Sequence, residues 1–388
     1  MVENLSENSK SRRMEKMNNL SPGGLYIHIP FCKSKCRYCD FYSFSGRENE
    51  REAYTARMEE ALLYYRERME RRYNSLYFGG GTPLFLGEER LERLLLGAKP
   101  DLTEGAEITV EGNPVLGGSF DFGRLYRAGA NRLSFGLQSA DERELKALGR
   151  LHSASDAADT VKAAQKAGFS DISLDLMLGI PYQTKESLAE SIGFCASLGV
   201  THLSAYLLKI EENTPLAKSD LRFLCADDEK ASELYLFACE ELERLGYRQY
   251  EISNFARDGH KSRHNLKYWN QEEYLGIGPS AHSFLGNRRF YFDRNFRDFL
   301  EKPFEELERE EGLGGDWEEY AMLRLRLTEG LDLRALSERF PEAPVSSIKS
   351  RAALYEKAGL TVVSENAVRL TPKGFLLSSP LTAEILYE

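Results

Sequence analysis

The chain has 388 residues, of which 42% are hydrophobic and 29% charged, and its formal net charge is −10. This composition is that of a globular protein of one large domain or two, and the acidic balance argues against a nucleic-acid binder, which needs a basic surface. No apolar run is long enough to span a bilayer, and six cysteines are too few for a disulfide scaffold of this size, which favours a reducing, cytoplasmic compartment.

The chain is predicted to divide into four parts. Residues 1–22 are polar, lack the apolar stretch of a secretory signal and are expected to form a flexible tail. We expect a core barrel over residues 23–250, a bridging region over 251–310 and a C-terminal domain over 311–388.

Short β-rich runs alternate with amphipathic segments in the first 210 residues. The predicted strands are LYIHIPF (25–31), SLYFGGG (75–81), EITVEGNP (107–114), RLSFGLQS (132–139), DISLDLMLGIP (171–181) and HLSAYLLKI (202–210). Helices are predicted by apolar residues three and four positions apart, over residues 50–71, 88–96, 142–148, 154–167 and 186–198. This alternation predicts an α/β fold with a parallel sheet and external helices. Since there are six units and not eight, we expect a partial (β/α)6 barrel, with an open doubly wound sheet as the alternative.

Polar and glycine-rich motifs lie at or near the carboxyl ends of these predicted strands. In chain order they are residues 32–39, GGGTP (79–83), Glu111 with Asn113, Gln138 with Ser139, Asp175 with Gly179, and Lys209. The carboxyl ends of parallel strands meet at one edge, where α/β proteins hold their sites. The sequence therefore predicts one site at one mouth of the barrel.

Three of the cysteines form a C-x3-C-x2-C loop directly after the first predicted strand: Cys32, Cys36 and Cys39. Zinc would need a fourth ligand there, such as His28 or Asp40. A [4Fe–4S] cluster held by three cysteines would keep one iron open to another ligand. The polar residues within the loop argue against three unligated core thiols. The other cysteines lie on apolar or helical stretches and are predicted to be packing residues: Cys195, Cys225 and Cys239.

The cysteine spacing, the aromatic Tyr38 before the last cysteine and the GGGTP stretch together resemble the radical S-adenosylmethionine (SAM) superfamily. The resemblance covers nearly the whole chain after the tail. It implies that the amino and carboxylate groups of SAM chelate the open iron, and that one electron from the cluster cleaves the sulfonium. Glycine in GGGTP would permit close approach to the methionine amino group.

Further motifs narrow the resemblance: YIHIPFC, GGGTP, RLSFGLQS and LDLMLGIP. They are similar to those of the group that contains oxygen-independent coproporphyrinogen III oxidases and HemW-type haem chaperones. Matching positions imply a first SAM site with Tyr26, Tyr38, Gly80 and Glu111. Gln138, Arg150 and Asp175 match positions that contact a second SAM in the oxidases, and Gly81 and Thr82 lie beside these positions. Taken singly, Glu111 and Asp175 could cap neighbouring helices, and Arg150 could form an exposed ion pair.

Two features favour the chaperones over the oxidases. Phe41 stands where the oxidases carry an additional cysteine, and HNLKYW (264–269) matches the HNxxYW pattern of the chaperones. The resemblance implies that haem binds at His264, Tyr268 and Trp269, since imidazole is a common axial ligand and the rings offer flat apolar area.

Three further histidines are predicted to have different roles. His260 and His282 are alternative second ligands for haem, whereas His28 alternates with apolar neighbours and is predicted to be a satisfied core histidine.

Different functional classes thus remain open. A haem chaperone would pass haem to an acceptor such as a respiratory haem protein, with at most peripheral membrane contact and no established turnover. An enzyme would use SAM for oxidative decarboxylation of coproporphyrinogen III, and a radical haem-opening enzyme is a third option. Phe41 and HNLKYW favour the chaperone.

Beyond residue 310, three predicted helices followed by a two-stranded turn resemble a winged helix. Residues 316–388 contain nine Lys or Arg and eleven Asp or Glu, so the segment has no basic excess for DNA. We expect a lid or docking module packed on the barrel.

Overall fold

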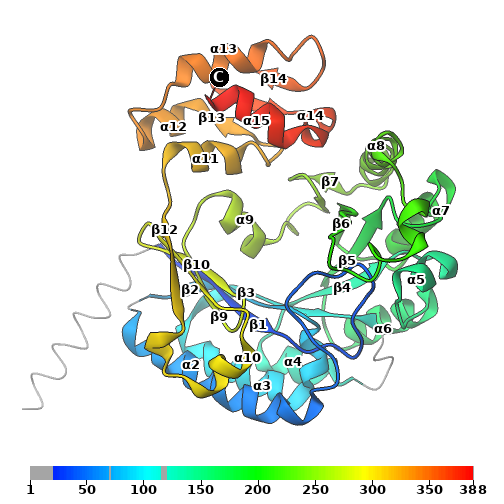
Figure 1. The fold of residues 1–388 in the computed structure, drawn as a ribbon, viewed down its shortest axis with the longest axis vertical. Coiled ribbons are helices and arrows are strands. Elements are labelled where there is room, and N and C mark those ends of the chain that lie inside the picture. The colour runs from blue at the N-terminus through cyan, green and yellow to red at the C-terminus, as the bar shows by residue number, and fades with distance from the viewer. Residues whose placement is uncertain (1–20, 70, 115–119, 388) are drawn as a thin grey trace, which may run out of the picture.

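The structure, a computed structural model, describes residues 21–69, 71–114 and 120–387. Within them, the main feature is a 12-stranded sheet in the order β12-β11-β10-β9-β1-β2-β3-β4-β5-β6-β8-β7 (Figure 1). Its parallel centre consists of β1 (Gly23–Ile29), β2 (Tyr73–Gly80), β3 (Leu102–Gly112), β4 (Arg132–Gln138), β5 (Asp171–Leu178) and β6 (His202–Leu207). Because β1 pairs with β9 and β6 pairs with β8, the sheet stays open as an incomplete barrel. The predicted fold class is confirmed.

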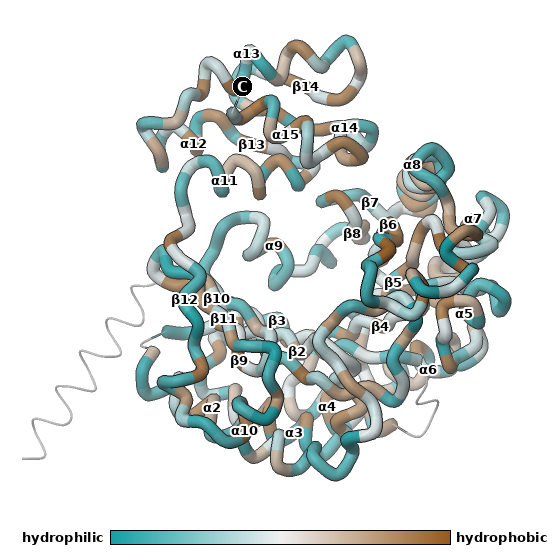
Figure 2. Tube along the Cα trace, in the orientation of Figure 1, coloured by the Kyte–Doolittle hydropathy of each residue, from teal (hydrophilic) through white to brown (hydrophobic). Residues whose placement is uncertain are grey.

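Helices cover the outer face of the parallel strands (Figure 1). They are α2 (Arg51–Arg68), α3 (Glu88–Ala98), α4 (Phe122–Ala128), α5 (Glu142–Leu148), α6 (Ala154–Lys166), α7 (Lys185–Ser197) and α8 (Asp228–Arg244). Figure 2 shows hydrophobic and hydrophilic residues mixed along these helices, as amphipathic helices require. The periodicity does not predict the short α4. No described helix combines the length and hydropathy that a bilayer span needs.

Alternation along each strand separates an apolar outer face from a polar inner face. On β3, Ile108 and Val110 are buried in the hydrophobic core, whereas Glu107, Thr109 and Glu111 point to the opposite side of the sheet. The inner face of the barrel is therefore lined by polar side chains.

The segment 248–313, which includes the region 251–310 predicted to bridge the domains, extends both edges of the sheet. It contains β7 (Arg248–Gln249), β8 (Asn254–Ala256), α9 (Arg263–Trp269), β9 (Tyr274–Ile277), β10 (His282–Leu285), β11 (Arg288–Phe292), α10 (Phe296–Glu301) and β12 (Glu308–Leu313). Helix α9 contacts β1 and β2 and lies between the sheet and the C-terminal domain (Figure 1).

The C-terminal domain is helical with a small sheet in the order β13-β15-β14. Its elements are α11 (Trp317–Arg324), β13 (Leu331–Asp332), α12 (Leu333–Arg339), α13 (Val345–Ala353), β14 (Thr361–Val363), β15 (Ala367–Leu370), α14 (Pro372–Leu376) and α15 (Ser378–Tyr387). Three helices before a two-stranded turn agree with the predicted order. The domain is held beside α9 by a hydrogen bond from Arg339 Nη2 to Gln271 Oε1 (2.8 Å).

Candidate functional site

The three cysteines lie in a loop between β1 and α2 whose base is closed by backbone hydrogen bonds. The N–H of Cys32 donates to the Phe44 carbonyl (2.9 Å), and the N–H of Phe44 donates to the Pro30 carbonyl (2.9 Å). Cys32 is buried, whereas Cys36 and Cys39 are half-buried. The loop thus leaves β1 from a fixed base and carries its outer thiols toward the mouth of the barrel.

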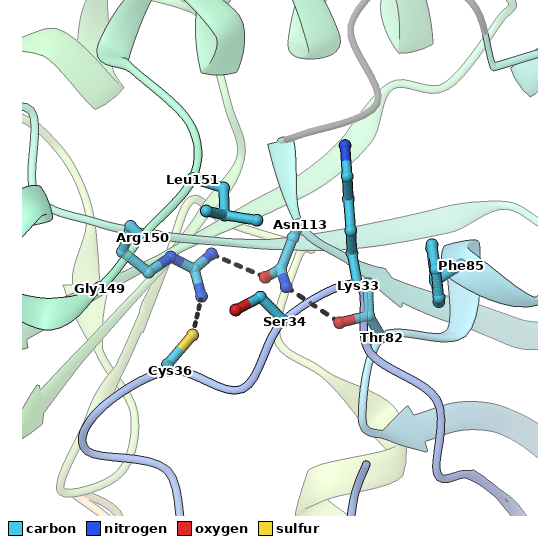
Figure 3. A pocket seen from close by; sticks show the side chains of 9 residues that line it. All are labelled: Lys33, Ser34, Cys36, Thr82, Phe85, Asn113, Gly149, Arg150 and Leu151. Carbon is cyan, nitrogen blue, oxygen red and sulfur yellow. Dashed lines mark hydrogen bonds between the residues drawn. The ribbon is translucent and has the colours of Figure 1, made fainter. Parts of the chain in front are cut away.

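A chain of side chains connects two of these thiols to the ends of β2 and β3 and to the turn after α5; Figure 3 shows its part from Cys36 to Thr82. Arg150 Nη1 donates to Cys36 Sγ (3.2 Å) and its Nη2 donates to Asn113 Oδ1 (2.7 Å). Asn113 Nδ2 donates to Thr82 Oγ1 (2.9 Å), which in turn donates to Cys32 Sγ (3.5 Å). Such donors favour thiolates and tune the potential of a bound cluster. The sequence placed Asn113 at a strand end but did not reveal that it bridges Thr82 and Arg150.

These residues surround a pocket at the mouth of the barrel (Figure 3). Its other lining residues are Lys33, Ser34, Phe85, Gly149 and Leu151. The carboxyl ends of β2 and β3 and the turn after α5 therefore meet the cysteine loop at one place, as the strand-end motifs predict.

The glycines of GGGTP let the end of β2 pack tightly against β1. Gly80 has φ +107°, and a Cβ atom on it would lie 2.4 Å from His28 Cε1. A Cβ on Gly81 would lie 2.8 Å from the Phe31 carbonyl oxygen. The N–H of Gly81 donates to the Ile29 carbonyl (2.8 Å). A side chain at either position would push the strand end away from the base of the cysteine loop.

Glu111 lies at the end of β3 beside two tyrosine rings. Tyr77 Oη donates to Glu111 Oε1 (2.6 Å), and the ring of Tyr26 stacks on Tyr77 at 6.3 Å between centroids. Burial raises the pKa of Glu111 to about 7; the bond from Tyr77 opposes this rise, and the nearby Asp175 carboxylate adds to it. Tyr77 is not among the residues that the sequence pattern singles out, and its signal is its place on the inner face of β2, two residues before Gly79.

The remaining predicted SAM residues lie on the same side of the sheet. Gln138 ends β4 with φ +73°, Asp175 accepts a hydrogen bond from Ser134 Oγ (3.4 Å), and Tyr38 packs on a buried cluster that contains Met177. Burial also raises the pKa of the Asp175 carboxyl. Lys209, in contrast, has a side chain that is 84% exposed and paired with Glu211, so it lies outside the site.

The donor set is compatible with a cluster that is bound by three thiolates and leaves one iron open. Of the other cysteines, Cys195 and Cys239 are buried in the hydrophobic core and Cys225 is half-buried after a separate helical turn, in agreement with packing roles. Among the described residues, no three His, Cys, Asp or Glu side chains lie close enough together to hold a single metal ion.

His28, the alternative fourth ligand for zinc, is satisfied inside the protein. Its Nε2–H donates to the Tyr42 carbonyl (2.8 Å) and its Nδ1 accepts from Tyr26 Oη (3.1 Å). Burial lowers its pKa to about 4. The prediction of a core histidine is confirmed.

His264 is only 1% exposed and both of its ring nitrogens have protein partners. Nδ1 lies 2.9 Å from Ser75 Oγ and Nε2 lies 2.8 Å from Tyr268 Oη, while the ring stacks on Tyr77 at 5.1 Å. Burial, with a contribution from the charge on Lys267, lowers its pKa to about 3. The haem-ligand role predicted for His264 therefore requires the Tyr268 hydroxyl to leave Nε2.

The other two residues of the predicted haem motif are also in contact with protein groups. Tyr268 packs edge-on against Tyr274 at 4.6 Å, and the Arg326 guanidinium lies 4.7 Å from the centre of the Trp269 ring. The motif thus joins β2 to the C-terminal domain in this structure.

Comparisons with known proteins agree with the fold. The model of the Radical SAM superfamily matches residues 26–195, and the model of the HemN C-terminal domain matches residues 316–377. The chain shares its fold with coproporphyrinogen III oxidase (HemN) from Escherichia coli, a radical SAM enzyme, with a TM-score of 0.81 and 20% identity over 96% of this chain and 92% of that one. Fold and cysteine loop together define a protein of the radical SAM class.

Curated relatives narrow this class. The chain is 34% identical to the "Heme chaperone HemW" of Bacillus subtilis over 94% of this chain and 99% of that protein. It is 36% identical to the protein of the same name from Escherichia coli over 81% of this chain and 85% of that protein. The chain belongs to the HemW family.

Replacement of Glu111 by glutamine is expected to change stability in a pH-dependent way. Because the folded-state pKa is raised to about 7, the stability due to this group is complete below its unfolded pKa and is lost as pH rises through 7. At pH 8, Glu111→Gln should therefore raise the free energy of unfolding of the cluster-free chain by about 2–3 kcal/mol, with little change near pH 4. Urea unfolding at both pH values measures this. Glu104→Gln, an exposed position on the same strand, is the control, and a Glu111→Gln effect equal at both pH values would contradict the assignment.

Proposed function

We propose that this chain binds haem and passes it to an acceptor haem protein, and that it carries a [4Fe–4S] cluster on Cys32, Cys36 and Cys39 with exchangeable SAM at the open iron. The observation that carries this proposal is the similarity to proteins called heme chaperones over 94% of the chain, combined with an intact three-thiol loop at the barrel mouth. When bound, the cluster would supply an electron and a Lewis-acidic iron to SAM.

The residues around the thiols would hold these groups in different ways. Thr82 and Arg150 donate to two of the sulfurs and would keep the cluster ligands in place. The backbone of Gly80 and Gly81 would meet the amino acid end of SAM, where side chains are excluded. Glu111, with its raised pKa, would accept a hydrogen bond from SAM in its charged form and exclude water together with Tyr26.

Three residues were matched to a second SAM site: Gln138, Arg150 and Asp175. Arg150 already bonds to Cys36, to Asn113 and to the Gly136 carbonyl. Both of its Nη nitrogens are thus in use, one of them on Cys36, which favours a role in holding the cluster ligand over contact with a second SAM.

Phe41 supports the chaperone over the decarboxylating enzyme. It replaces the additional cysteine of the oxidases. The residue is 69% exposed, and its carbonyl oxygen accepts a hydrogen bond from Lys35 Nζ (2.8 Å). The loop thus has a solvent-facing ring where the oxidase-type chain would carry another thiol.

An anaerobic assay distinguishes the two functions. Reconstituted chain, loaded with haem, is mixed with apomyoglobin as a generic acceptor, and transfer is followed by the change of the Soret band. In parallel, the chain is incubated with coproporphyrinogen III, SAM and a reductant. We expect haem transfer and no protoporphyrinogen; formation of protoporphyrinogen in catalytic amounts would show the enzyme instead.

A further inference from the structure

The six histidines of the chain differ in how far their side chains are exposed to solvent. Four are buried: His28, His152, His202 and His264. The side chains of the other two, His260 and His282, are 33% and 53% exposed. A ligand as large as a porphyrin can reach only an imidazole at the surface without local rearrangement, so these two merit comparison.

His282 presents a ring whose orientation is held from two sides. It opens β10 and lies directly opposite Tyr291 of β11 in the antiparallel ladder, with the two rings stacked at 5.3 Å and 22° between planes. Its Nδ1 lies 3.4 Å from Glu311 Oε2. Since a carboxylate can only accept, Nδ1 carries the hydrogen, and in the neutral ring the Nε2 lone pair is left free. No described residue hydrogen-bonds to Nε2.

The fold builds this arrangement through an irregularity in the neighbouring strand. Between β11 and β12, Arg289 pairs with Gly312 and Phe290 pairs with Glu310, so Glu311 has no partner in the ladder. Such a bulge redirects a side chain, and here it brings the Glu311 carboxylate to the imidazole. In many metal sites a carboxylate accepts the hydrogen of the histidine nitrogen that does not bind the metal. This bond orients the ring and raises the basicity of the nitrogen that does bind it.

His282 lines an open groove of about 510 Å³, within the usual range of ligand sites. Its lining residues are Ser280, His282, Tyr291, Phe292, Asp293, Arg294, Glu310 and Glu311. Two of the acidic residues have cationic partners: Asp293 pairs with Arg309 and Glu310 pairs with Arg288. The third, Glu311, accepts the hydrogen of the neutral imidazole.

Arg294 is the groove cation without a carboxylate partner among the described residues. It is exposed, and its charge reaches His28 next to the cysteine loop. The groove therefore offers one imidazole lone pair, one aromatic ring and one guanidinium that pairs with no described carboxylate, close to the segment that leads into the thiol loop.

We propose that His282 Nε2 is the axial ligand of haem iron in this groove, with Arg294 pairing a haem propionate; this assignment rests on the haem-binding function proposed above. A bare metal ion needs three or four protein ligands, which the groove does not bring together, whereas a porphyrin already supplies four nitrogens and needs only one imidazole. His264 differs from His282 because both of its ring nitrogens have protein partners. Nδ1 joins α9 to Ser75 of β2, and Nε2 is bonded to the Tyr268 hydroxyl within α9.

The test is an anaerobic hemin titration of the full chain with its cluster reconstituted, followed by the Soret band and by the resonance Raman iron–histidine stretch. His282→Ala should weaken hemin binding at least about tenfold and remove the iron–histidine signal, and added imidazole should restore that signal. Glu311→Gln should retain hemin with an affinity about 10-fold lower and a shifted stretch. His260→Ala, the other surface histidine, is the matched control and should behave as the wild type.

The outcomes separate this assignment from the function on which it rests. If the wild-type chain binds no hemin and delivers none to apomyoglobin, the proposed function fails. If the wild type binds hemin and His282→Ala keeps its affinity and iron–histidine signal, the assignment to His282 is overturned. Loss of the signal in a folded His264→Gln variant, with the signal intact in His282→Ala, would place the ligand on α9 instead.

Discussion

Replacement of Cys36 by alanine is expected to remove the iron–sulfur cluster from the chain. In the proposed site, three thiolates are the protein attachments of the cluster, and Cys36 is the one that also accepts a hydrogen bond from Arg150 (3.2 Å). Without it, the cluster would be left with two ligands at the half-exposed mouth of the loop. We expect iron and sulfide to fall from about four of each per chain to a small residue, together with loss of the 400 nm absorbance, on the order of a tenfold change in metal content.

Cys225→Ala is the matched control for this prediction. Cys225 is also half-buried, but it follows the helical turn Asp220–Leu224 and has its Sγ near the Leu221 carbonyl (3.6 Å). Its variant should keep full iron and sulfide content. Retention of a complete cluster by Cys36→Ala would contradict the three-thiol site.

Replacement of Gly81 by alanine is expected to weaken SAM binding and to destabilise the fold. The added Cβ would lie 2.8 Å from the Phe31 carbonyl and 2.9 Å from the Ile29 carbonyl, both backbone atoms that cannot turn aside as a side chain can. The end of β2 would have to move away from the base of the cysteine loop. We expect SAM affinity at least about tenfold lower and a free energy of unfolding about 1–3 kcal/mol lower, by equilibrium dialysis and urea unfolding.

Gly193→Ala tests the same chemical change where there is space. Gly193 lies within α7, and apart from its chain neighbours and the backbone of its own helix no atom lies within 4 Å of the position that its Cβ would take. That variant should bind SAM as the wild type does and gain about 0.5–1 kcal/mol in stability, because alanine favours the helix. Wild-type SAM affinity in Gly81→Ala would show that close backbone approach is not needed there.

Cys36→Ala and Gly81→Ala both test whether the cysteine loop and the end of β2 form one rigid unit at the barrel mouth. Backbone hydrogen bonds join residues 29–31 to Gly81 and Thr82, and the side chains of Thr82, Asn113 and Arg150 continue this connection to the sulfurs. The end of β2 and the cysteine loop are thus one unit. A change in either is expected to affect both cluster retention and SAM affinity, since rigid supporting contacts hold a site in its productive geometry.

Strand positions and the site at their carboxyl ends could be predicted from sequence because both depend on local patterns. The alternation of short β-rich runs with amphipathic segments was sufficient to place the parallel strands. The limits were less accurate: β3 begins at Leu102 and not at 107, and β6 ends at Leu207 and not at 210. Pairing with neighbouring strands decides where a strand begins and ends, and that information is not local.

The histidines illustrate what local pattern does not contain. In the sequence, His264 stands in a motif that resembles a haem site, and His282 stands without one. The structure buries the first against Ser75, which is 189 positions away in the chain, and leaves the second at the surface beside Glu311. Which nitrogen is free depends on these long-range contacts.

The sequence by itself determined the fold class, the cysteine loop and the common edge to which the motifs belong, since strand periodicity and cysteine spacing act over a few residues. Only the tertiary structure decided which groups bond to the sulfurs, which tyrosine supports Glu111 and which imidazole faces solvent. Hydrogen bonding and burial arise between strands that are distant in the chain, so these properties exist only once the sheet has formed.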